Sequence, residues 1–146
     1  MNDVQNELNI LDEINKGASM GVSAIQDIKP KVKDRNFLDV LDTEEDKYHR
    51  ISDRVTSLYK NFSEKNPHTP NGMEKAMASW GIEMKTMTDD TTSKLAELLV
   101  KGTNMGIIEG RRLLNHNPNA DKEVHDLLNE FVTMQEDSVE TLKKYL

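Results

Sequence analysis

Hydrophobic side chains recur every three or four residues along most of this chain, which is the spacing of amphipathic helices. Hydrophobic and polar residues do not alternate with period two over any useful length, so we predict no strand. The proline and glycine positions divide the pattern into five helices. We expect these helices at residues 3–28, 34–62, 72–87, 89–114 and 118–146, with the third shorter than the others.

Each predicted helix has one hydrophobic face, and these faces together define the expected core. In chain order the residues of these faces are Val4, Leu8, Leu11, Ile14, Ala18, Val22, Ile25, Phe37, Leu41, Tyr48, Ile51, Val55, Leu58, Tyr59, Phe62, Met73, Met77, Trp80, Met84, Met87, Leu95, Leu98, Leu99, Met105, Leu113, Val124, Leu127, Leu128, Phe131, Val139 and Leu142. Thr88 and Asp89 are the expected N-terminal cap of the fourth helix. Pro118 suits the first position of the last helix.

The connections between the helices predict how they are arranged. Four helices are about 25 residues long, or roughly 38 Å each. Tight turns join the first two and the last two, so each pair forms an antiparallel hairpin. The shorter helix lies in the long connection between the hairpins and can carry the chain back along the bundle. We therefore predict an all-α, ferritin-like four-helix bundle with a short crossover helix, in which the second and fourth helices are parallel. Plain up-down packing of five helices is the alternative.

Length and composition indicate one domain spanning residues 1–146. The absence of cysteine excludes disulfides and thiolate metal sites. No secretory signal is recognisable at the start, and no hydrophobic run approaches the ~20 residues that span a bilayer. We expect a cytoplasmic protein.

The charge of the chain bears on its partners. There are 26 acidic and 19 basic residues, a formal net charge of −7, and the basic residues are interspersed with acidic ones. Proteins that bind nucleic acid usually carry a basic surface that displaces counterions from phosphate. We therefore expect neither nucleic acid nor an anionic membrane as a partner.

Three segments resemble a known family. They are LNILDEINKGASMGVSAI in the first helix, the short helix from Gly72 to Trp80, and LAELLVKGTNMGIIEGRRLL in the fourth helix. Together they are similar to an uncharacterised bacterial four-helix-bundle family, a domain of unknown function grouped with ferritin-like and rubrerythrin-like proteins. The resemblance covers nearly the whole chain and implies the fold and a stress or storage context, but no activity. Family members often have an acidic residue after the glycine that matches Gly102, where this chain has Thr103.

Ferritin-like enzymes hold two metal ions with a glutamate from each of two helices and Glu-x-x-His from each of the other two. The closest match here is Asp46-x-x-His49. On a helical wheel both residues lie opposite the hydrophobic face of their helix, so we interpret them as part of a solvated face. The sequence therefore contains no complete di-metal ligand set.

Three carboxylates do fall on hydrophobic faces: Glu7, Glu44 and Glu109. We expect Glu44 at the level of Gln135, Ser138 and Gly21, and Glu7 near Glu109 towards the other end of the bundle. One hypothesis is a reduced carboxylate site for iron or manganese, since a buried charge requires a partner or a metal. The alternative is that Glu7 and Glu109 pair with bases such as Arg112 or reach solvent, and that Glu44 hydrogen-bonds Gln135 or a water molecule.

Small residues form a second notable pattern, with glycines one turn apart at 17 and 21 and at 102, 106 and 110. Glycine lowers helix stability, so we expect either a close approach of helices or a cavity beside the bare backbone. The fourth helix also has a second hydrophobic strip of Val100, Ile107 and Leu114. The crossover helix or a second subunit must cover it, so a homodimer is one expectation.

No nucleophile setting or phosphate-binding loop is recognisable, so the sequence does not predict an enzyme. Our leading hypothesis is a non-catalytic ferritin-like bundle that acts by binding or self-association and needs no cofactor. The alternative is a protein that binds iron or manganese through Glu44, or through Glu7 and Glu109. A third hypothesis is a small-molecule site in a glycine-lined cavity beside Gly102 and Gly106.

Overall fold

A computed structural model describes residues 3–68 and 72–146, and it contains five α-helices and one short 3-10 helix in those residues. The long helices are α1 (Asp3–Ile28), α2 (Arg35–Tyr59), α4 (Thr92–His116) and α5 (Lys122–Lys143), and the shorter one is α3 (Met73–Thr86). The 3-10 helix η1 (Lys29–Lys31) lies in the turn after α1. No strand is present in the described residues, as predicted.

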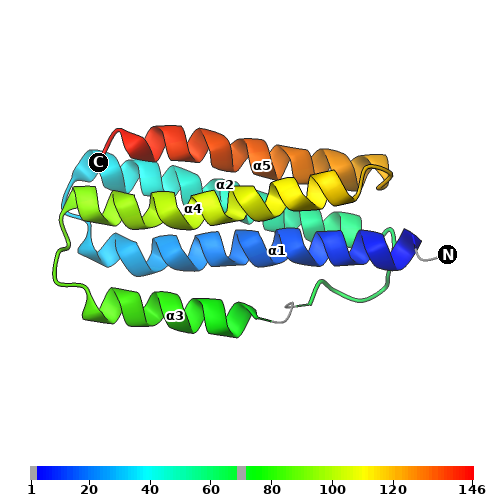
Figure 1. The fold of residues 1–146 in the computed structure, drawn as a ribbon, viewed down its shortest axis with the longest axis horizontal. Helices are drawn as coiled ribbons and strands as arrows, with labels where there is room; N and C mark the ends of the chain where they lie inside the picture. Colours follow the sequence, from blue (N-terminus) through cyan, green and yellow to red (C-terminus); the bar gives the residue numbers. More distant parts are fainter. Residues whose placement is uncertain (1–2, 69–71) are drawn as a thin grey trace.

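The four long helices form one bundle, and α3 lies along its outside beside α1 (Figure 1). Helices α1 and α2 pack as one hairpin, and α4 and α5 pack as the other. Because α3 carries the chain back along the bundle, α2 and α4 run in the same direction (Figure 1). The predicted crossover topology is therefore confirmed, and plain up-down packing of five helices is not observed.

Side-chain caps determine where three of the long helices begin. Asp34 accepts a hydrogen bond from the backbone N–H of Phe37 at 3.0 Å, which satisfies a free N–H in the first turn of α2. Thr91 caps α4 and Asp121 caps α5. The cap predicted at Thr88 and Asp89 was therefore two to three residues too early, because the Asp89 carboxylate instead accepts from the backbone N–H of Thr91. The prediction for Pro118 was also wrong, since α5 begins only after Asp121.

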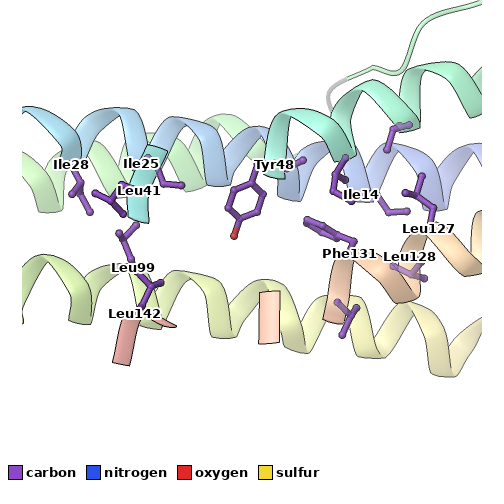
Figure 2. Packing of buried hydrophobic residues seen from close by; sticks show 14 of the residues in the cluster. Ile14, Ile25, Ile28, Leu41, Tyr48, Leu99, Leu127, Leu128, Phe131 and Leu142 are labelled. Atoms are coloured by element: carbon purple, nitrogen blue, oxygen red, sulfur yellow. The ribbon is translucent and has the colours of Figure 1, made fainter. Parts of the chain in front are cut away.

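The core runs along the centre of the bundle and contains most of the predicted residues. Figure 2 shows Leu41, Leu99 and Leu142 packed together towards one end, and Phe131, Leu127 and Leu128 towards the other. The ring of Tyr48 lies between these groups, 6.3 Å from the ring of Phe131 in an edge-on arrangement (Figure 2). Among the described residues, no helix is long and apolar enough to cross a membrane.

The inward face of α4 differs from the predicted one. Met105 is 69% exposed although it was predicted to be buried, and the exposed residues Gly102 and Glu109 lie on the same side of the helix. The buried face instead runs through Leu95, Ala96, Leu98, Leu99, Thr103, Gly110 and Leu114. Val4, at the start of α1, is likewise exposed rather than buried.

Candidate functional site

A cavity of about 270 Å³ lies where α3 crosses the outside of the bundle. Its wall comes from all five α-helices and is mostly hydrophobic. It includes Met20, Gly21, Ile25, Leu41, Glu44, Tyr48, Met77, Trp80, Leu98, Leu99, Gly102, Thr103, Met105, Ser138 and Leu142. The volume is close to the ~300 Å³ at the lower end of small-molecule sites in proteins.

A buried carboxylate stands at the inner end of this cavity. The side chain of Glu44 is only 4% exposed, as its position on the hydrophobic face of α2 predicted. Its Oε2 atom accepts a hydrogen bond from the Ser138 hydroxyl at 2.9 Å, and Lys47 Nζ lies 3.4 Å away. The Ser138 hydroxyl also lies 3.0 Å from the backbone oxygen of Met134, so its single proton is shared between two acceptors. Ser138, and not Gln135, is therefore the partner of Glu44.

Tyr48 and Thr103 add two hydroxyl groups to the cavity wall. Burial raises the pKa of Tyr48 to about 12, a hydrogen bond with Thr103 lowers it, and the charge of Glu44 raises it. Thr103 donates to the backbone oxygen of Leu99 at 2.7 Å. Thr103 thus faces inwards beside Tyr48, where it supplies a neutral hydroxyl.

The glycines serve two different purposes. At Gly21 a Cβ atom would lie 2.6 Å from the Tyr48 ring, and at Gly106 it would overlap the side-chain oxygen of Gln135. Gly110 is similarly filled by Val132. These positions therefore allow close packing between α1 and α2 and between α4 and α5. At Gly102 nothing lies within 4 Å of the added atom, and this glycine lines the cavity. Both explanations considered from the sequence thus apply, at different glycines.

Glu7 and Glu109 do not form the predicted pair. Glu7 is buried, and it accepts a hydrogen bond from the backbone N–H of Asp121 at 3.2 Å, so it holds the α4–α5 loop against α1. Glu109 is 66% exposed and pairs with Arg112 at 2.6 Å. The prediction that Glu109 faces the interior is therefore wrong, because it lies on the outer side of α4 with Met105. The alternative pairing with Arg112 is confirmed for Glu109, whereas Glu7 is buried and bonds a backbone N–H in place of a base.

Asp46 and His49 lie on the solvated face of α2, as predicted. His49 is 54% exposed, and its Nε2 atom lies 3.6 Å from Glu45. Within residues 3–68 and 72–146, no three carboxylate or imidazole side chains are grouped so that they could hold a metal ion. The ligand set of a ferritin-like di-metal site is thus not assembled from these residues.

Asp12 is a buried carboxylate that the sequence prediction missed. It accepts hydrogen bonds from the backbone N–H of His68 at 3.1 Å and from the Tyr59 hydroxyl at 3.4 Å, and His68 Nε2 lies 3.2 Å away. It therefore ties the segment after α2 to α1. The signal in the sequence was weak: Asp12 is four residues after Leu8, but it lies at the edge of the hydrophobic face. It is buried because a loop covers that edge.

Comparison with known proteins supports the architecture. No protein-family model matches the chain, and no curated protein sequence does. Among solved structures, a mutant of Dps1 from Mycobacterium smegmatis matches with a TM-score of 0.79 at 16% sequence identity. The match covers 99% of this chain and 97% of that one. At this identity the likeness shows the fold, so the predicted ferritin-like bundle is confirmed.

Proposed function

We propose that this protein binds a small, mostly apolar molecule in the cavity between α3 and the bundle. The observation that carries the proposal is the cavity itself, which combines a hydrophobic wall with a few polar groups at its inner end. Cavities of this kind are the usual ligand sites of proteins. The proposal makes the leading sequence hypothesis, binding, more specific, and it agrees with the idea of a glycine-lined cavity beside Gly102. The prediction that the cavity also extends beside Gly106 is wrong, because the side chain of Gln135 fills the space next to this glycine.

A fluorescent apolar probe tests the proposal directly. N-phenyl-1-naphthylamine is neutral and emits more strongly in an apolar site than in water. Trp80 is the single tryptophan and lines the cavity, so its own emission reports on the same site. We expect saturable binding of one probe per chain, with a change in Trp80 emission over the same concentration range. Non-saturable binding, or binding without a response of Trp80, would contradict the proposal.

A matched pair of variants tests where the probe binds. Gly102→Leu adds a side chain at the cavity wall where nothing obstructs it, and we expect at least ~10-fold weaker probe binding, because several buried methylene-sized volumes are filled. Gly81→Leu makes the same change in α3 at a position that is also open but does not line the cavity. We expect near wild-type binding from this control. Equal effects of the two substitutions would place the probe elsewhere.

The second candidate function is binding of iron or manganese with a reduced ligand set. Two observations favour it: the ferritin-like fold, and the buried carboxylate of Glu44 with few hydrogen-bond partners. The site would have to be built on the carboxylates of the cavity wall, Glu44 and Glu83, because Glu109 is exposed and Glu7 is bonded to the α4–α5 loop. Two carboxylates without an imidazole are a poor ligand set for these metals, so this candidate ranks second.

Metal analysis separates the two candidates. Protein purified without chelator is analysed for iron and manganese, with Glu44→Ala alongside. Stoichiometric metal in the wild type that is lost in this variant would establish the metal-binding function. We expect substoichiometric metal in both proteins.

A further inference from the structure

We propose that the ligand of this cavity is an amphiphile whose head group donates hydrogen bonds to Glu44, with a primary alkylamine as the fitting class. This inference rests on the proposed function, because it specifies the molecule that the cavity takes. It is drawn from the hydrogen bonds of the inner end and the dimensions of the wall.

Glu44 has fewer partners than a buried carboxylate normally has. An ionised carboxylate can accept about four hydrogen bonds. Here both close contacts, from Ser138 and Lys47, are made to Oε2, and the Ser138 proton is shared with a backbone oxygen. Within the described residues, Oε1 accepts no hydrogen bond. Glu44 is thus paired through Oε2, and its Oε1 atom can still accept a hydrogen bond, so the inner end of the cavity favours a molecule that brings a donor.

Trp80 gives an independent sign of a missing partner. Its indole Nε1 is buried, and no acceptor among the described residues lies within hydrogen-bond distance. Buried indole N–H groups usually have an acceptor. Trp80 also lines the cavity, so among the described residues the same wall contains one donor and one carboxylate oxygen without partners. An ammonium head can satisfy the carboxylate oxygen, but it has no acceptor for the Trp80 N–H, which indicates only that this wall is open to a further polar group or water.

The rest of the cavity wall indicates what the non-polar part of the ligand is like. Between α3 and the bundle it consists mainly of apolar side chains such as Met20, Met77, Leu98 and Leu99. The cavity volume of about 270 Å³ is near the lower end of the ~300–1,000 Å³ of small-molecule sites, so it takes a compact molecule and not a long lipid. A chain of about eight carbons with a single polar head therefore fits. The wall has two carboxylates, Glu44 and the exposed Glu83, but no group of three ligand side chains that could hold a metal ion lies among the described residues, so a single ammonium head suits Glu44 better than a metal ion does.

The test compares ligands that differ only in the head group. n-Octylamine, n-octanol and n-octanoate are titrated at pH 7 below their aggregation concentrations, with Trp80 emission as the readout. Hydrogen bonds between oppositely charged groups are stronger than neutral ones, so we expect the amine to bind at least ~10-fold tighter than the carboxylate, with the alcohol between them. Equal affinities, or preference for the carboxylate, would overturn this inference.

Variants test whether Glu44 is the group that causes the preference for the amine. Glu44→Gln keeps the shape but removes the charge, and we expect it to abolish the preference for the amine while N-phenyl-1-naphthylamine still binds. Glu109→Gln removes the same charge at an exposed site and should change neither. Lys47→Ala removes the ammonium group that already pairs with Glu44, so it should tighten amine binding. This variant tests whether Glu44 binds the head group even if Glu44→Gln does not fold. If Lys47→Ala leaves amine binding unchanged, Glu44 is not the group that binds the head.

The results for the neutral probe keep the two proposals separate. If N-phenyl-1-naphthylamine binds and responds to Gly102→Leu but the amine has no advantage, the cavity is a ligand site and only the choice of ligand is wrong. If the neutral probe does not bind, the proposed function fails, and this inference fails with it.

Discussion

Tyr48 couples the core to the cavity, because its ring packs against Phe131 while its hydroxyl stands beside Thr103 near Glu44. A tyrosine in this position must remain neutral, since an ionised ring would place a second negative charge next to Glu44. Burial is the main reason that its pKa is raised from 10.0 to about 12. The phenol therefore stays protonated in the folded protein at pH values where it ionises in the unfolded chain.

This difference predicts a loss of stability at high pH. Below pH 10 both states hold the proton and the contribution is fully present. Between pH 10 and about 12 only the unfolded state loses the proton, so the unfolding free energy should fall by up to ~1.4 kcal/mol per pH unit. Urea unfolding at pH 9, 10, 11 and 11.5 measures this slope. Tyr48→Phe should have a shallower slope, while Lys29, whose pKa is also raised to about 12, contributes equally to both proteins. Identical slopes would contradict the assignment.

The hydrogen bonds of Asp12 lead to a second prediction, which concerns the stability of the protein. Asp12→Ala leaves the His68 N–H and the Tyr59 hydroxyl without their acceptor, so we expect a loss of about 1–3 kcal/mol in the unfolding free energy. Urea unfolding measures it, with Asp53→Ala as a control, since Asp53 is an exposed acid of α2. A cost no greater than that of the control would show that Asp12 does not hold the segment after α2.

At the scale of elements, the periodicity predicted the helices well but misplaced the inward face of α4. Helix boundaries agree to within a few residues because caps and prolines act locally. The face of α4 depends on what packs against it, and the wheel alone did not indicate that the side with Gly102, Met105 and Glu109 is left largely uncovered. Glu109 was misassigned for that reason, whereas Glu44 was placed correctly on the single hydrophobic face of α2.

Gly21 is closely surrounded and Gly102 is not, so replacing each with alanine should change the stability in opposite directions. Gly21→Ala places a Cβ atom 2.6 Å from the rigid Tyr48 ring, so we expect a loss of ~1–3 kcal/mol despite the better helix propensity of alanine. Gly102→Ala meets nothing within 4 Å, so we expect a gain of ~0.5–1 kcal/mol. Thermal and urea unfolding of both variants check the signs. Equal signs would show that α1 and α2 have room to separate.

Helix α3 should be the least protected of the five helices. It packs mainly against α1, and most of its residues are at least partly exposed, with Met84 its one buried side chain. Elements with few buried contacts open at lower free energy. Hydrogen exchange should therefore be faster over residues 73–86 than in α4 or α5, and N-phenyl-1-naphthylamine should slow it there selectively. Uniform protection across all helices would contradict this expectation.

At the scale of the whole molecule, the sequence predicted the topology because short turns and one long connection leave few ways to arrange four long helices. It predicted that Glu44 lies at the level of Gln135, Ser138 and Gly21. The structure places Glu44, Ser138 and Gly21 together in the cavity wall, whereas Gln135 packs against Gly106. It did not predict the cavity's extent, because that depends on where α3 lies on the bundle. It also missed Asp12, whose burial depends on a loop.

Self-association remains a prediction, but the residues that support it are not the ones that suggested it from the sequence. Val100 and Ile107 are partly buried and Leu114 is buried within the chain, so the strip that suggested a dimer is mostly covered. The exposed hydrophobic residues of α4 are instead Met105 and Ile108. If these mediate a homodimer, sedimentation should give twice the chain mass of 16.7 kDa, and Ile108→Glu should restore the single-chain value. A wild-type mass of one chain would reject the dimer.

The peripheral position of α3 has a consequence for how such proteins diversify. One wall of the cavity belongs to a helix that contributes little to the central core, so substitutions in α3 can reshape the pocket at a small cost to folding. The carboxylate, by contrast, is fixed in the bundle. If the cavity takes the proposed amphiphile, substitutions in α3 should change which tail is accepted while Glu44 keeps the same role toward the head.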